Sequence, residues 1–166
     1  KAKTNYKFEK KLLNVDHYSD QHWKNLMAKK NDYLFEKDNL KNFRSNIISY
    51  GLDNSNIGMQ NKDIYRNNLI DLYQKFKVKI NPYILKYLNE SDLGNPLTVE
   101  FDDFTFSKSS FEFSLITSYL YQYLSNIKCM VEIGGGYGGL SKIIKSLFPS
   151  IKIILVDLPE SNVISN

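Results

Sequence analysis

The segment Cys129–Glu160 constrains the fold of this chain more than any other, and it reads CMVEIGGGYGGLSKIIKSLFPSIKIILVDLPE. An apolar run is followed by a glycine-rich stretch, a helical pattern, a second apolar run and an acidic residue. This order predicts a strand over Met130–Ile133, a helix over Leu140–Leu147 and a second strand over Ile151–Val156. Because a helical crossover joins parallel strands, the segment predicts the start of an α/β fold with a ligand at the edge of a parallel sheet.

The glycine-rich turn has the chemistry of a ligand-binding loop; its glycines are Gly134, Gly135, Gly136, Gly138 and Gly139. Glycine lets the backbone turn sharply and lets a ligand approach without a Cβ in the way. The N–H groups at the start of the following helix then face an anionic group of the ligand. Asp157 ends the second strand, 21 residues after Gly136, near the spacing expected for a carboxylate that binds ribose hydroxyls. A nucleotide-type cofactor is therefore expected.

Two cofactor classes fit these glycines. Gly134, Gly136 and Gly139 satisfy the G-x-G-x-x-G pattern of dinucleotide sites. Read from Glu132, the same stretch satisfies E-x-G-x-G-x-G, the first motif of class I S-adenosylmethionine-dependent methyltransferases. Glu132 favours the second class, because its carboxylate would repel a pyrophosphate but suits an ammonium and a sulfonium. A glutamate that ends a buried apolar strand would also be costly without a partner.

The residues before this unit predict a mostly helical N-terminal region over 1–126, followed by the cofactor unit over 127–166. A short helix is expected to open at Asn81-Pro82 and to end near Leu88, and the residues around Asp102-Asp103 predict a hairpin of Leu97–Phe101 with Phe104–Phe106. Helical spacing of apolar residues predicts longer helices over Asp20–Phe35, Lys37–Tyr50, Asp63–Phe76 and, from a capping box at Ser109–Glu112, to near Leu124.

The predicted fold class is α/β, a helical N-terminal region followed by the truncated β-α-β start of a Rossmann-like domain. A two-stranded parallel pair leaves its faces and edges uncovered. The chain is therefore expected to be a piece of a longer protein, or to pair with something else.

Composition argues against several kinds of partner. The net charge is +4 and no basic cluster is longer than the pair Lys29–Lys30, which argues against nucleic acid. No stretch approaches the roughly 18–20 apolar residues of a membrane span, and no signal peptide is visible. A single cysteine, Cys129, excludes an internal disulfide and fits a reducing, cytoplasmic compartment. Its place in the apolar run 127–133 predicts a buried thiol.

At this point the residues resemble a known group. VEIGGGYGGL followed by IILVDLPE is similar to the first two motifs of class I O-methyltransferases, and Asp-Leu-Pro is typical of those acting on small molecules. More specifically, the chain resembles a bacterial sugar O-methyltransferase family. Members of that family also carry a tryptophan, a Phe-Arg pair and a Gly-Asn-Pro, here Trp23, Phe43-Arg44 and Gly94-Asn95-Pro96.

The resemblance implies that Glu132 and Gly134 to Gly138 surround the methionine part of S-adenosylmethionine. It implies that Asp157 binds the ribose and that Leu158 lies near the adenine. Tyr137 would either line the methyl-transfer site or pack on the start of the helix. The implied reaction is attack of a sugar or glycan hydroxyl on the cofactor methyl group.

No catalytic residue is assigned, because the usual base or metal ligands of this fold are expected beyond Asn166, and no metal site is predicted. The N-terminal region is expected to cover the cofactor cleft, to contribute to the pocket of a small-molecule or glycan acceptor, or to mediate homodimerisation. Two alternatives stay open: an NAD(P)-dependent oxidoreductase, and a non-catalytic binding module that keeps the β-α-β unit.

Overall fold

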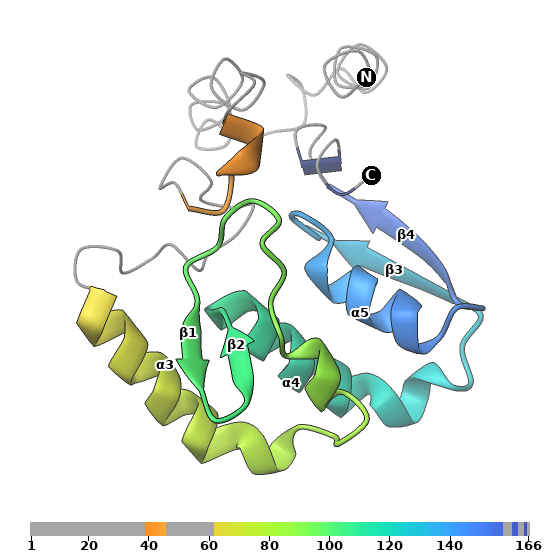
Figure 1. The fold of residues 1–166 in the computed structure, drawn as a ribbon. Helices are drawn as coiled ribbons and strands as arrows, with labels where there is room; N and C mark the ends of the chain where they lie inside the picture. The colour runs from red at the N-terminus through yellow and green to blue at the C-terminus, as the bar shows by residue number, and fades with distance from the viewer. Residues whose placement is uncertain (1–38, 46–61, 158–160, 163–164, 166) are drawn as a thin grey trace.

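The computed structural model describes residues 39–45, 62–157, 161–162 and 165 (Figure 1). The helix predicted over Asp20–Phe35 and the residues Trp23 and Leu158 lie outside this part of the chain. Among the described residues, no helix combines the length and apolarity needed to cross a bilayer.

A helix and a hairpin form the first core. Helix α3 (Lys62–Phe76) buries Tyr65, Leu69 and Tyr73, because four-residue spacing places them on one face. Strands β1 (Val99–Phe101) and β2 (Phe104–Phe106) pair in antiparallel register beside α3 (Figure 1). The Tyr73 ring lies between 5.1 and 6.3 Å, centroid to centroid, from the rings of Phe101, Phe104, Phe106 and Phe111. The predictions of this helix and of this hairpin are confirmed.

The helix predicted over Lys37–Tyr50 is wrong in its described part. Asn39–Lys41 forms one 3-10 turn, η2, and the chain then bends through turns as far as Ser45. The reason is a tertiary contact: the backbone N–H of Arg44 donates to the carbonyl of Gly94 at 2.8 Å instead of continuing a helix.

Short 3-10 turns also replace the helix predicted after Asn81-Pro82. The Asn81 side chain does cap the turn, since its Oδ1 accepts a hydrogen bond of 3.0 Å from the N–H of Tyr83. The regular part is limited to η6 (Leu85–Tyr87), and another turn, η5 (Lys77–Lys79), follows α3 directly.

The N-cap of helix α4 (Lys108–Leu124) lies two residues earlier than predicted. The N-cap is Ser107, whose Oγ accepts from the N–H of Ser110, while Ser110 Oγ accepts from the N–H of Ser107. The capping box predicted at Ser109–Glu112 is therefore wrong. Strand β2 ends at Phe106, and Ser107 keeps the extended backbone of an N-cap before the helix begins at Lys108.

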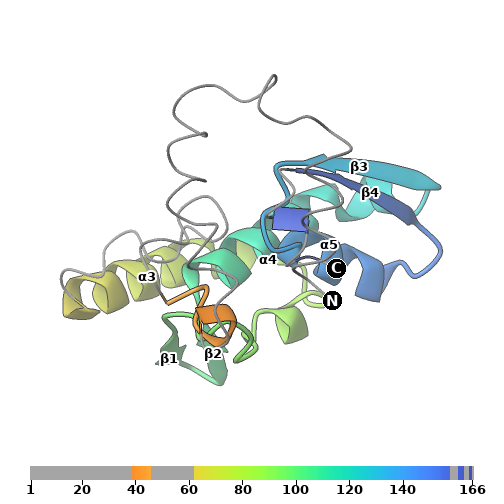
Figure 2. The ribbon, with the colours of Figure 1, turned by 90° about the horizontal axis from the view of Figure 1, so that it is seen from above.

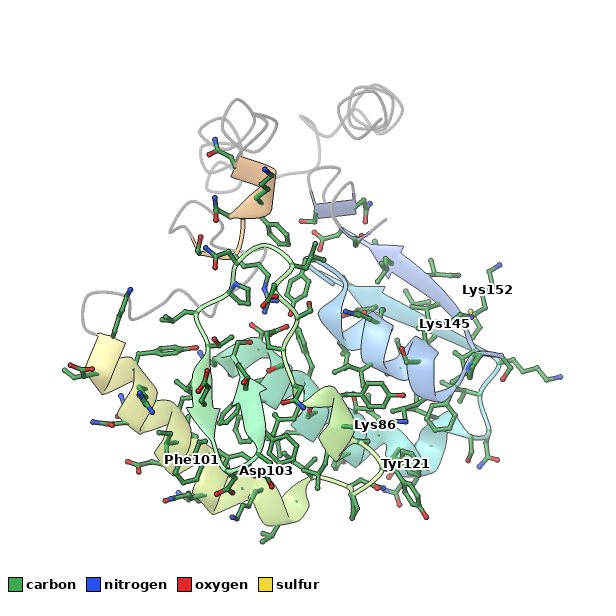
Figure 3. The ribbon with its side chains drawn as sticks, in the orientation of Figure 1. Lys86, Phe101, Asp103, Tyr121, Lys145 and Lys152 are labelled. Atoms are coloured by element: carbon green, nitrogen blue, oxygen red, sulfur yellow. The ribbon has the colours of Figure 1, made fainter. Side chains whose placement is uncertain are left out.

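The second core forms around a β-α-β unit. Strands β3 (Cys129–Ile133) and β4 (Lys152–Val156) are parallel, with Glu132 opposite Leu155, and α5 (Gly139–Leu147) connects them. Helices α4 and α5 lie on the same face of this sheet (Figure 2). Where α5 leads into β4, Lys145 Nζ donates to the carbonyls of Pro149 and Ile151 at 2.7 and 2.8 Å. Figure 3 labels Lys145 and Lys152 at this end of the unit.

The two faces of this sheet differ in exposure. Met130 and Ile153 pack with Leu124 of α4 and Ile144 of α5. On the opposite face, Val131 is 55% exposed and Ile133 is 82% exposed. Among the described residues, helices cover only one face of these apolar strands. Cys129 lies on the uncovered face, so the prediction of a buried thiol is wrong.

Candidate functional site

The glycine-rich loop follows β3 at the carboxyl edge of the sheet. The Gly134 N–H donates to the carbonyl of Val156 at 2.8 Å, so the loop starts as an extension of the β3–β4 ladder. Gly134, Gly136 and Gly138 have φ values of 71°, 57° and 81°, which strain any residue with a Cβ. A Cβ added at Gly134 would meet no atom within 4 Å. The loop therefore leaves open space where a ligand can approach the backbone.

Asp157 lies against the middle of this loop. Its Oδ2 accepts a hydrogen bond of 2.7 Å from the N–H of Gly136, and the side chain is half-buried. The predicted ribose-binding carboxylate and the predicted loop thus form one surface at the ends of β3 and β4. This is the edge at which parallel sheets bind ligands.

Glu132 brings a second carboxylate to the same edge. It lies on the covered face of the sheet, where Ser141 Oγ of α5 donates a hydrogen bond to Glu132 Oε2. Burial raises the pKa of Glu132 above 4.5, partly offset by the hydrogen bonds from Ser141, and the charge of Asp157 adds to the increase. Two neighbouring carboxylates suit a ligand that carries a positive charge and hydroxyl groups, and they disfavour a pyrophosphate.

Tyr137 packs at the start of α5. Its ring centroid lies 6.1 Å from that of Phe43 and 6.0 Å from that of Phe113 on α4. The guanidinium carbon of Arg44 lies 4.3 Å from the same centroid. This arrangement corresponds to the second of the two predicted for Tyr137, and contact of its side chain with a cofactor stays a prediction.

Gly139 lets α5 approach α4 closely. An added Cβ would lie 2.4 Å from Phe113 Cε2 and 2.7 Å from the hydroxyl oxygen of Tyr137. The last glycine of the pattern therefore serves packing between helices, while Gly134 faces open space.

A cavity of about 460 Å³ lies between η6 and α5, beside this loop. Aromatic residues, polar residues and two lysines share its lining, among them Lys86, Tyr87, Asn89, Phe113, Tyr137 and Lys142. Lys86, on η6, is labelled in Figure 3. In the described part of the chain, no three His, Cys, Asp or Glu side chains are placed to hold a metal ion.

The sequence did not predict the polar cluster formed by Arg44, Glu90 and Ser107. Arg44 Nη2 lies 2.7 Å from Glu90 Oε2 and 3.3 Å from Ser107 Oγ. The sequence motifs that take part in this contact are the Phe43-Arg44 pair and Gly94. A Cβ added at Gly94 would lie 2.5 Å from the Phe43 ring. A single sequence does not show that these distant motifs meet.

A model of one protein family, described as an O-methyltransferase domain, matches residues 99–166. The matched range starts at β1 and includes the glycine-rich loop, Glu132 and Asp157. This similarity supports an S-adenosylmethionine-dependent methyltransferase. Comparison of the chain with curated proteins and with solved structures gives no significant match.

Proposed function

We propose that this chain carries the cofactor-binding part of an S-adenosylmethionine-dependent O-methyltransferase that acts on a hydroxyl of a sugar or glycan precursor. The observation that carries the proposal is the pair of carboxylates, Glu132 and Asp157, beside a glycine-rich loop that is open at Gly134. This pair lies within the range that matches the O-methyltransferase domain.

The donor set fits the parts of S-adenosylmethionine. Glu132 would attract its ammonium and sulfonium charges, and the N–H groups at the start of α5 would face its carboxylate. Asp157 would bind the ribose hydroxyls, and Leu158 would lie near the adenine. When bound, the cofactor supplies an electrophilic methyl group.

An NAD(P)-dependent oxidoreductase would use the same β-α-β unit with a pyrophosphate against the loop. Glu132 argues against it, because its carboxylate lies on the α5 side of the sheet and accepts a hydrogen bond from Ser141 in the first turn of α5. A pyrophosphate at the start of α5 would meet this charge and that of Asp157 at short range.

The sugar acceptor is proposed from the family resemblance together with the cavity beside the loop. Tyr87, Phe113 and Tyr137 line that cavity, and aromatic faces suit the apolar faces of sugar rings. Lys86 and Lys142 in the same lining would favour an acceptor that carries a negative group. A cytoplasmic location, a homodimer and the absence of a nucleic-acid partner stay predictions.

The test is methyl transfer by the full-length protein from S-adenosylmethionine labelled with tritium in the methyl group. Free monosaccharides, nucleotide sugars and phenols serve as separate acceptor panels. Label on a sugar that is lost in Asp157→Asn but kept in Asp103→Asn supports the proposal. Asp103 is a matched control because it is an exposed aspartate in the β1–β2 turn, away from the loop (Figure 3). Transfer to phenols alone would contradict the sugar assignment.

A further inference from the structure

Arg44 is a fully buried charge whose surroundings are built from three separate segments. Arg44 as a whole is 0% exposed, and the side chain of its salt-bridge partner Glu90 is 8% exposed. Ser107, the N-cap of α4, donates to Glu90 and accepts from Arg44. A buried guanidinium is tolerated only when it is paired and hydrogen-bonded in this way. The cluster therefore fixes the plane of the guanidinium.

The guanidinium of Arg44 lies over the ring of Tyr137. The distance of 4.3 Å from Arg44 Cζ to the ring centroid is a cation–π contact. An arginine can donate hydrogen bonds in its plane and stack on a ring with its face, whereas a lysine ammonium does not combine the two. Phe43 and Phe113 hold the ring from other directions.

Tyr137 carries the only side chain in the loop, since every other residue of 134–139 is glycine. Its neighbours Gly136 and Gly138 both have positive φ values, and glycines restrict the backbone little on their own. A contact that holds Tyr137 therefore restrains the backbone on both sides of it. Ordering such a loop before a ligand binds reduces the entropic cost of binding.

We propose that Arg44 is a positioning residue for the glycine-rich loop: oriented by Glu90 and Ser107, it holds Tyr137 and so sets the affinity of the loop for its cofactor. The inference rests on the proposed function for the identity of the cofactor. It assigns a role to the Phe43-Arg44 pair, which lies outside the range that matches the O-methyltransferase domain.

The first test is a double-mutant cycle on the full-length protein, with binding of S-adenosylhomocysteine measured by calorimetry. Arg44→Lys keeps the charge but loses the stacked plane, and Tyr137→Leu removes the ring. Each change is expected to weaken binding about tenfold. The double variant is expected to be no weaker than either single variant, because both remove one contact. In both single variants the cofactor KM should rise about tenfold with kcat little changed. Arg66→Lys and Tyr119→Leu, at exposed positions of α3 and α4, serve as matched controls.

Unchanged binding in a folded Arg44→Lys variant would overturn the inference, and so would losses that multiply in the double variant. If Arg44→Lys does not fold, Tyr137→Leu decides alone, because unchanged binding in that variant contradicts the inference.

The second test does not use the cofactor. In the ligand-free protein, the amides of Gly136 and Gly138 donate to Asp157 and to the carbonyl of Gly135. Arg44→Lys should speed their hydrogen exchange about tenfold, measured by NMR, while α3 amides stay unchanged. A wild-type protein that binds no S-adenosylhomocysteine would contradict the proposed function. Hydrogen exchange of the loop amides would still decide the role of Arg44. Unchanged loop exchange would overturn that role.

Discussion

The Asp157 carboxylate accepts a hydrogen bond of 2.7 Å from the backbone N–H of Gly136, which joins the end of β4 to the middle of the loop after β3. Gly136 is buried, so its N–H group has little access to water. The side chain expected to bind a ribose therefore also satisfies a backbone donor of the loop.

This dual role predicts different stabilities for two substitutions of Asp157. Asp157→Asn keeps an oxygen acceptor for Gly136, whereas Asp157→Ala leaves a buried N–H unpaired, which costs about 1–3 kcal/mol. In urea denaturation, the alanine variant should be less stable than the asparagine variant by about 1 kcal/mol or more. Both should lose cofactor affinity. Equal stability of the two variants would contradict the structural role of the hydrogen bond.

Glu132 predicts a pH dependence. Burial raises its pKa above the ordinary value of a glutamate, so the folded state favours the protonated form more than the unfolded state does. No penalty exists below the pKa of the unfolded state, about 4.3, and a penalty develops as pH rises through the raised pKa. Glu132→Gln stays neutral at every pH, so its stability relative to the wild type should rise between about pH 4 and about pH 8.

Urea denaturation at both pH values checks this, with Glu100→Gln, on the exposed side of β1, as the matched control. The same Glu132→Gln variant should bind the cofactor more weakly, because it no longer attracts a cation. A stability difference that stays constant or shrinks with pH would argue against a penalised carboxylate.

Gly139 predicts a packing cost. In Gly139→Ala the new Cβ would lie 2.4 Å from Phe113 Cε2, and overpacking of this kind costs about 1–3 kcal/mol. Phe113→Leu should recover part of that loss in the double variant, measured as a shift in the thermal midpoint. Strictly additive effects of the two substitutions would show that the clash is relieved elsewhere.

We expect replacement of Thr117 to stabilise the protein. Its Oγ1 is buried and has no hydrogen-bond partner in the described part of the chain. Thr117→Val removes the unpaired hydroxyl at nearly constant shape and should stabilise the protein by about 1 kcal/mol. Ser118→Ala, one residue later, should destabilise it by about 1 kcal/mol, because Ser118 Oγ accepts from the N–H of Asn81 at 2.9 Å. Thermal denaturation of both variants checks the contrast.

The sequence predicted elements whose signal is local. The strands over Cys129–Ile133 and Lys152–Val156 and the helix over Gly139–Leu147 agree with the predicted bounds within about one residue, because apolar runs and glycines mark them directly. Of the candidate site, the meeting of Gly136 with Asp157 follows from the parallel pairing of the strands.

Features that depend on distant contacts were not predicted. The helix expected over Lys37–Tyr50 is interrupted because the Arg44 backbone bonds to Gly94 and its side chain to Glu90. The N-cap of α4 lies at Ser107 because β2 ends just before it. The periodicity of apolar residues within a segment does not show which distant residues contact it or where the preceding strand ends. Only the structure shows the contacts of Arg44 and the position of the N-cap of α4.

Calorimetric titration of the full-length protein with S-adenosylhomocysteine, with and without excess NADH, tests the central claim most directly. The account predicts saturable one-to-one binding that NADH does not displace, that Asp157→Asn weakens and that Asp103→Asn leaves unchanged. Displacement by NADH, or no binding of S-adenosylhomocysteine by the folded protein, would contradict it.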